Sequence, residues 1–209
     1  MIASLMLAAA ISGAVDAELA FARDAQRVGQ WTAFRRYADA DAVMFTPQAV
    51  WARDFLKGRK NPPRSVRWRP SASFSSCDGR TAVNFGPAFT AEGKAYGTFT
   101  TVWQRGARGW RWVYDGGGPI EGNPTIEGRP TVRSAACTGK TPGPPIAPPP
   151  PLTPRQARNT PQDNGRGQSA DGTLGWDWVV TKEGARRFRA FLWNGAIYEQ
   201  IVYQQVAAP

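Results

Sequence analysis

The chain has 209 residues, of which 42% are hydrophobic and 11% aromatic, and its formal net charge is +10. This length and composition allow one well-cored domain with an appendage and exclude an intrinsically disordered protein. Because the sequence has no histidine and only two cysteines, it excludes His-dependent catalysis, His-ligated metals and a structural zinc site, so we expect no metal and no cofactor.

The chain begins with an uncharged apolar run from Ile2 to Ile11, followed by small residues that suit a cleavage site. Residues 1–14 therefore resemble a signal peptide, and the expected location is periplasmic or secreted. The run is short and has no basic residue before it, so the alternative is the apolar first turn of a helix in a cytoplasmic protein. It is too short to span a membrane.

Helices are expected in the first part of the chain. Apolar residues recur at steps of three and four from Asp16 to about Tyr37, and Gly29 divides this pattern into two helices. A short buried strand is expected over residues 42–46, and a third short helix over residues 48–57.

From Val66 the pattern changes to an alternation of apolar and polar residues, which predicts an antiparallel meander. Its four strands are expected over residues 66–77, 81–90, 96–104 and 110–114. In the last strand, a period of two places Trp110, Trp112 and Tyr114 on one face and Asp115 on the other. The following glycines are expected to end the regular structure.

The second half of the chain has a different composition. Residues 119–170 are expected to be a proline-rich linker or a strap on the surface, because the 13 residues from Pro142 to Pro154 include eight prolines. Residues 171–209 predict a three-stranded β meander with a hairpin turn at Asn194-Gly195. Three strands alone are marginally stable, so the meander should pack on the first unit or on a second copy of it.

Two stretches of the chain resemble the nuclear transport factor 2-like (NTF2-like) superfamily, which includes the SnoaL-like cyclases and the ketosteroid isomerase-like proteins. They are DAELAFARDAQRVGQWTAFRRYADADAVMFTP near the start and FTTVWQRGARGWRWVYDGG at the end of the first unit. The resemblance covers about residues 15–118. It implies an α+β, cystatin-like cone, in which N-terminal helices lie against a curved antiparallel sheet and leave an apolar pocket at the open end. Members include enzymes and non-catalytic binding proteins, so the fold does not fix an activity.

The residues that carry catalysis in this family have no clear match here. Its dehydratases use a His–Asp arrangement, and its isomerases use a buried Asp base with a Tyr donor. Weak candidates in this chain are Tyr37, Asp39 and Asp41, where the second helix meets the first strand, and Asp115 at the sheet end. For each aspartate the alternative is an ordinary turn residue bonded to its own backbone.

Eight aromatic residues are candidates for the wall of a ligand pocket, and the alternative for each is an ordinary place in the core. They are Phe45, Trp51, Phe55, Trp68, Phe85, Phe99, Trp103 and Trp112. The two cysteines, Cys77 and Cys137, form one disulfide if the chain is exported and otherwise remain two free thiols.

Three arginines, Arg105, Arg108 and Arg111, lie beside tryptophans and suggest a nucleic-acid surface. Alternation instead turns Trp110 and Trp112 inward, and the chain has no block of five basic residues, so we expect no nucleic-acid partner and read the charge as favouring anionic ligands in general.

The leading hypothesis is a non-catalytic domain of the cell envelope that binds a small apolar or amphipathic molecule, or a protein partner. One alternative is an isomerase or lyase that acts through Asp and Tyr alone. Another is a homodimer whose sheets pack face to face.

Overall fold

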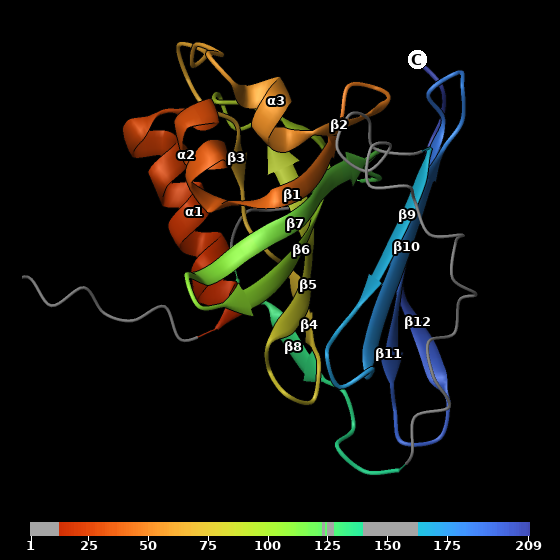
Figure 1. Cartoon of the computed structure of the whole chain (residues 1–209). Coiled ribbons are helices and arrows are strands. Elements are labelled where there is room, and N and C mark those ends of the chain that lie inside the picture. The colour runs from red at the N-terminus through yellow and green to blue at the C-terminus, as the bar shows by residue number, and fades with distance from the viewer. Residues whose placement is uncertain (1–12, 123, 125–127, 140–162) are drawn as a thin grey trace, which may run out of the picture.

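The computed structural model describes residues 13–122, 124, 128–139 and 163–209. Almost all of the expected signal peptide, and the proline-rich run, lie outside these ranges. The described elements form three layers, with helices on one side, a mixed sheet in the middle and an antiparallel sheet on the other side (Figure 1). The fold class is therefore α+β, as expected. None of the helices in the described ranges is long and apolar enough to cross a membrane.

Two helices form the first layer, α1 (Ala14–Val28) and α2 (Gln30–Tyr37). They meet at Gly29, as predicted, where φ is 96°. Any other residue would be strained at position 29, because its Cβ would lie 2.2 Å from the side chain of Asn61. The same Asn61 amide accepts a hydrogen bond from the Thr32 backbone (3.0 Å), which fixes the start of α2 to the loop after α3.

The segment after α2 differs from the prediction. Strand β1 (Ala38–Phe45) begins directly at the helix end. The expected helix over residues 48–57 is a short strand, β2 (Ala49–Trp51), followed by the five-residue helix α3 (Ala52–Leu56). Antiparallel pairing of β2 with β1 gives these residues hydrogen bonds that a longer helix would have supplied.

The middle layer contains the expected antiparallel meander, in the order β7-β6-β5-β4. Its remaining strands are β3 (Arg67–Trp68), β4 (Ala72–Ser75), β5 (Thr81–Phe89), β6 (Ala95–Gly106), β7 (Gly109–Gly118) and β8 (Thr131–Ser134). The sheet is mixed rather than purely antiparallel, because β1 pairs in parallel with β7 and β8 pairs in parallel with β4. Strand β8 comes from the segment that was expected to be a linker.

A β-bulge in β7 makes the predicted alternation wrong beyond Trp112. Val102 pairs with Tyr114 and Trp103 pairs with Trp112, so Val113 is an extra residue without a partner in the ladder. Trp112 packs in the core under the helices, whereas Tyr114 packs in the second core, on the opposite face of the sheet. The bulge therefore moves every following side chain to the face opposite the one that a strict period of two predicts.

The third layer has four strands rather than the expected three. They are β9 (Asn164–Gln168), β10 (Leu174–Val180), β11 (Arg186–Trp193) and β12 (Tyr198–Val206), in the order β12-β11-β10-β9. The additional edge strand, β9, lies in the polar segment before the meander. Its two glycines pair directly with tryptophans of β10, Gly165 with Trp178 and Gly167 with Trp176.

The C-terminal sheet packs on the face of the mixed sheet that the helices leave open (Figure 1). The rings of Tyr114 and Phe188 lie 4.5 Å apart in this second core. Polar contacts join the sheets as well, since the Thr100 hydroxyl donates to Gln204 Oε1 (3.1 Å). The meander thus packs on the first unit of its own chain and does not need a second copy.

Both sheets contain the same pair of turns. The sequence Ser-x-Asp-Gly occurs at residues 76–79 and 169–172, and Thr-x-Glu-Gly occurs at residues 90–93 and 181–184. In each Ser-x-Asp-Gly turn, the serine hydroxyl donates to the aspartate at 2.5 Å. The two turns also touch, because the Asp78 backbone donates to the Asp171 carboxylate (2.7 Å). This contact clamps the β4–β5 hairpin to the β9–β10 hairpin.

A disulfide joins Cys77 to Cys137 on the mixed-sheet side of this clamp. Cys77 lies in the first of these turns, and Cys137 lies shortly after β8.

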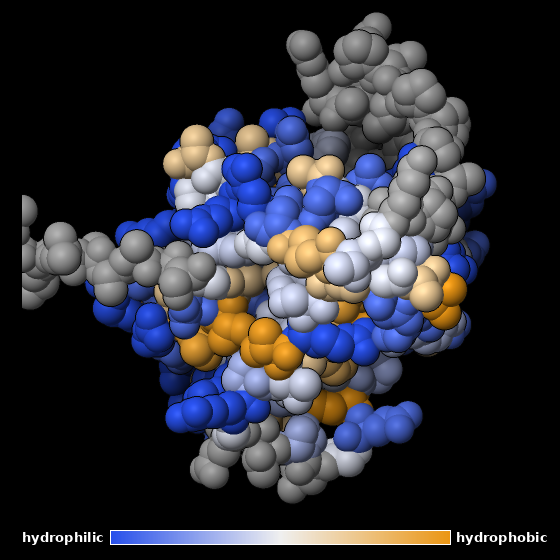
Figure 2. Space-filling view, turned by 90° about the horizontal axis from the view of Figure 1, so that it is seen from below, coloured by the Kyte–Doolittle hydropathy of each residue, from blue (hydrophilic) through white to orange (hydrophobic). Residues whose placement is uncertain are grey.

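Seen from below, hydrophobic residues reach the surface in small groups in the middle of the face, among hydrophilic ones (Figure 2).

Candidate functional site

A cavity of about 470 Å³ lies where strands β1 and β7 separate. In the described ladder, pairing between these strands ends at Val43 and Tyr114. Beyond this point β1 turns into β2, whereas β7 continues to Gly118 beside β6. The cavity occupies the resulting gap. Its apolar wall includes Phe34, Met44, Phe45, Val66, Trp68 and Phe99, and its polar groups are Tyr96, Thr98, Asp115 and Arg186.

One wall of the cavity is bare backbone, formed by residues 116–118 and Gly97. The sequence predicted that the glycines after Asp115 end the regular structure, and this prediction is wrong. They continue β7 in register with residues 98–100 of β6. At Gly117 a Cβ would lie 2.2 Å from the carbonyl oxygen of Thr98, so a side chain cannot occupy this position.

Asp115 is the carboxylate on this wall. The bulge at Val113 places it opposite Thr101, on the helix-facing side of the sheet. Burial raises the pKa of Asp115 well above its usual value, the negative charge of Glu18 raises it further, and the positive charge of Arg186 opposes both. The interpretation of Asp115 as a turn residue at the sheet end is therefore wrong.

A second carboxylate, Glu18 of α1, lies deeper and is fully buried. Its oxygens accept hydrogen bonds from the indole nitrogens of Trp68 (2.7 Å) and Trp103 (2.6 Å), from the Asn84 amide (3.2 Å) and from the Thr101 hydroxyl. Burial raises the pKa of Glu18, and these hydrogen bonds lower it in part. Because Trp68 also lines the cavity, Glu18 holds one of the cavity walls in place.

The position of Glu18 in the helical pattern is itself a signal that this residue is buried. Glu18 precedes Phe21 by three residues and Ala25 by seven, so it lies on the apolar face of the helix. An acidic residue on such a face is rarely buried without partners.

Arg186 enters the cavity from the other sheet. It lies at the start of β11, and its Nη2 atom donates a hydrogen bond to the carbonyl oxygen of Gly117. Its guanidinium group lies over the ring of Phe45, at 4.3 Å from the ring centre. The C-terminal sheet thus supplies one of the charged groups of the site, which no pattern within residues 15–118 could show.

The eight aromatic candidates divide into three groups. Phe45, Trp68 and Phe99 line the cavity. Trp103 and Trp112 are fully buried in the core under the helices. The other three pack against one of the two cores without lining the cavity, and they are Trp51, Phe55 and Phe85.

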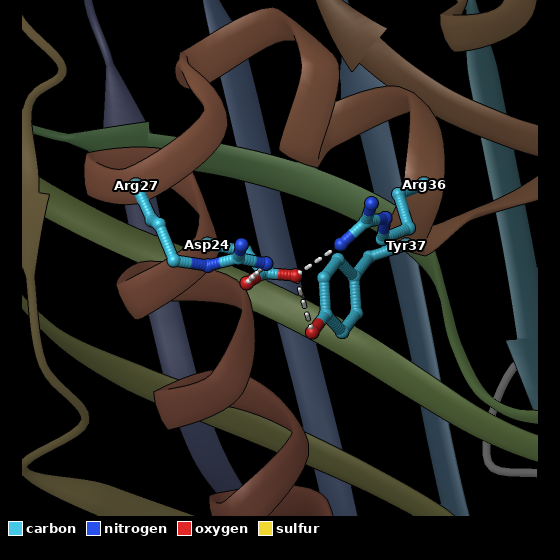
Figure 3. A network of polar contacts seen from close by, with 4 residues as sticks. All are labelled: Asp24, Arg27, Arg36 and Tyr37. Carbon is cyan, nitrogen blue, oxygen red and sulfur yellow. Dashed lines mark hydrogen bonds and ion pairs between the residues drawn. The ribbon is translucent and has the colours of Figure 1, made fainter. Parts of the chain in front are cut away.

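Tyr37 does not reach the cavity. Its hydroxyl donates to Asp24 of α1 (3.2 Å), which also forms ion pairs with Arg27 (3.0 Å) and Arg36 (2.7 Å), as Figure 3 shows. Partial burial acts to raise the pKa of Asp24, but the hydrogen bonds from Arg27, Arg36 and Tyr37 outweigh it and lower the pKa. This network joins α1 to α2 and has a structural role.

Asp39 and Asp41, the other candidates at the junction of α2 and β1, also lie outside this cavity. The Asp41 side chain is 81% exposed and lies 3.7 Å from Arg53. Asp39 lies 3.8 Å from Arg108, beside a second hollow of about 510 Å³ that Arg80, Arg105 and Arg111 also line.

This second hollow contains all three arginines that had suggested nucleic acid. Trp110 and Trp112, however, are 5% and 0% exposed, as alternation predicted for them. They offer no stacking surface to a base. Within the described ranges, no group of three or more acidic or cysteine side chains has the arrangement of a metal site.

Comparisons with known proteins add little to this geometry. No family model matches the chain, and no curated protein is similar to it. A solved structure from Novosphingobium aromaticivorans, described as a "putative aromatic ring hydroxylase", shares 17% sequence identity, with 52% of this chain and 87% of that chain covered and a TM-score of 0.34. A similarity this low assigns neither a fold family nor an activity.

Proposed function

We propose that this chain binds a small amphipathic molecule in the cavity between β1 and β7, without catalysis. The observation that carries the proposal is the composition of the cavity, which has an apolar wall that includes Trp68 and Phe99 and a polar end made by Asp115 and Arg186. Its volume of about 470 Å³ falls within the usual range for small-molecule sites. An apolar wall with a few placed polar groups binds the body of a ligand and orients its polar end.

The proposal includes an NTF2-like cone over residues 15–118. Two helices packed on one face of a meander, with a cavity at one end of the sheet, support it.

A location in the periplasm or outside the cell is part of the same proposal, and the disulfide supports it because disulfides persist in oxidising compartments. A homodimer through the outer sheet face is not proposed, since the C-terminal sheet covers that face.

Filling the cavity tests the binding proposal. Ala88 lines the cavity and is 4% exposed, so Ala88→Leu places extra carbon atoms in the space for the ligand. Binding of the neutral fluorophore N-phenylnaphthylamine should weaken in Ala88→Leu. It should be unchanged in Ala196→Leu, because Ala196 lies exposed in the β11–β12 turn. Equal binding by both variants would place the fluorophore elsewhere and remove the proposal.

A second candidate function is proton transfer by Asp115 in an isomerase or lyase. One observation favours it: the bulge turns Asp115 into the cavity, where burial raises its pKa toward the range that suits a general base. Tyr96 lines the same cavity. The test is exchange of the protons next to the carbonyl of a cyclic ketone, followed by NMR in deuterated water. Exchange that the wild type accelerates and Asp115→Asn does not would favour this function over simple binding.

A further inference from the structure

Among the described residues, Arg186 has no acidic partner within ion-pair distance. Its one hydrogen bond in the described part of the chain joins Nη2 to the carbonyl oxygen of Gly117. Nε and Nη1 have no partner there, and no carboxylate of the described residues lies within ion-pair distance. The contact with the ring of Phe45 favours a positive charge but does not neutralise it.

The surroundings of Arg186 make the missing anion significant. The residue is partly buried and lines a largely apolar cavity. Asp115, the acidic residue on the cavity wall, has a raised pKa because of burial and the charge of Glu18, which favours its neutral form. A partly desolvated guanidinium that has no ion pair among the described residues is costly unless an anion binds to it.

Another arginine of the same strand shows the contrast. Arg189 pairs through two nitrogens with the carboxylate of Asp177 on β10, with Nε at 3.0 Å from Oδ1. Strand β11 therefore satisfies Arg189 from within its sheet. It directs Arg186 into the cavity, where the remaining donors of this residue are open.

We propose that the ligand is a small amphipathic carboxylate, whose carboxylate group pairs with Arg186 and whose apolar body lies against Trp68 and Phe99. This inference rests on the proposed binding function and adds the chemical class of the ligand. A guanidinium group presents parallel N–H donors that match the two oxygens of a carboxylate. The Asp115 carboxyl group, when protonated, donates a further hydrogen bond to the same anion.

The arrangement gives the C-terminal sheet a role in the site. Phe188 shares the face of β11 with Arg186 and packs against Tyr114 in the second core, which holds the start of the strand at the cavity. The paired turns at the other end of the sheet fix its position relative to the mixed sheet. The first unit thus supplies the apolar wall, and the C-terminal sheet supplies the group that selects an anion.

The experiment compares decanoate with decan-1-ol at neutral pH by isothermal titration calorimetry, since these ligands share a tail and differ in charge. Wild type should bind decanoate more tightly, and Arg186→Met should lose roughly ten- to a hundredfold in decanoate affinity with little change for the alcohol. Arg187→Met is the matched control, because Arg187 is the next residue of β11 and faces the opposite side. It should behave as wild type.

The outcomes separate this inference from the proposed function. Equal affinity of wild type for both ligands, or a decanoate preference that persists in Arg186→Met, overturns the carboxylate inference and leaves amphipathic binding intact. Binding of neither ligand overturns both. If Arg186→Met does not fold, Arg186→Lys replaces it, because lysine keeps the charge but not the paired donors. It should weaken decanoate binding selectively, and an unchanged affinity would count against the inference.

Discussion

Thr101 and Asp115 face each other across the β6–β7 ladder, and this pairing holds a carboxyl group on the side of the sheet that the helices cover. The hydroxyl of Thr101 donates to Glu18, so two carboxylates lie near one another inside the first unit. Burial raises the cost of ionising both, and the charge of Glu18 adds to it for Asp115. The pair should therefore be visible in the pH dependence of stability.

Replacing Asp115 with asparagine should remove part of that dependence. The pKa of Asp115 is raised in the folded state, so the folded protein holds this proton more tightly than the unfolded chain does. The wild type then loses stability as the pH rises from about 4, the pKa of an unfolded aspartate, through the folded pKa, by about 1.4 kcal/mol for each unit of difference. Below that window the contribution is fully present.

Urea unfolding between about pH 4 and pH 8 checks this expectation. The free energy of unfolding of Asp115→Asn relative to wild type should increase with pH across the window. Some pH dependence should remain in the variant, because Glu18 also has a raised pKa and acts in the same direction. A difference that is constant with pH would show that Asp115 titrates normally and is not desolvated in the cavity.

Glu18→Gln should destabilise the protein by about 1–3 kcal/mol, because the amide nitrogen must face one of the groups that now donates to the carboxylate. The indole of Trp68 donates alone to Oε1, whereas Trp103 and other donors share Oε2. The amide nitrogen of the new glutamine should therefore face Trp68, and the indole N–H of Trp68 should lose its acceptor. Unfolding followed by tryptophan fluorescence measures the loss.

The control for this variant is Asp54→Asn, since Asp54 has a side chain that is 64% exposed and only a distant ion pair. Its stability should stay within about 0.5 kcal/mol of wild type. Because Trp68 lines the cavity, Glu18→Gln should also weaken binding of N-phenylnaphthylamine, whereas Asp54→Asn should not. A fully stable Glu18→Gln would mean that the carboxylate is not needed to satisfy its donors.

Local patterns predicted the helical layer well. Gly29 was identified as the junction of two helices, because a glycine that interrupts a helical period marks a backbone position unsuited to other residues. The strands from Thr81 onward were also found, since alternation and turn residues agree there. These features depend on sequence neighbours, and the chain supplies them locally.

The site depends on features that local patterns do not contain. The bulge at Val113 reverses the side-chain alternation and so hides Asp115 from a period of two. Arg186 reaches the cavity only because the C-terminal sheet packs on the first unit, a tertiary event. Strand β9 was missed because its glycines and polar residues have low strand propensity, and the tryptophans of β10 compensate for this.

Loss of the disulfide should destabilise the whole chain. The bond between Cys77 and Cys137 joins residues 60 apart in sequence, and a loop of this length gives about 4 kcal/mol in the chain-entropy estimate. The double variant Cys77→Ser with Cys137→Ser should lower the free energy of unfolding by about 2–5 kcal/mol. Urea unfolding of the wild type with and without reductant provides the comparison. Reductant should have no effect on the variant, and equal stability of all samples would contradict a stabilising role for the bond.

The edge strand β9 makes the sharpest stability prediction. Gly167 pairs with Trp176, and a Cβ built at Gly167 would lie 2.2 Å from the indole ring. The ring therefore lies directly against the bare backbone of the edge strand. Because Trp176 is 5% exposed and belongs to the core between the sheets, the ring cannot move without disturbing that core.

Gly167→Ala should thus lower the free energy of unfolding by about 1–3 kcal/mol, the range for an overpacked core. The matched control is Gly106→Ala at the end of β6, where a Cβ would meet no atom within 4 Å. Replacing that glycine should be neutral or should stabilise by about 0.4–1 kcal/mol, because alanine has fewer unfolded conformations. Opposite signs for two Gly→Ala changes within strands, measured by urea unfolding, would establish that ring contact rather than backbone entropy determines the cost. Equal effects would mean that the β9 backbone does not lie under the tryptophan.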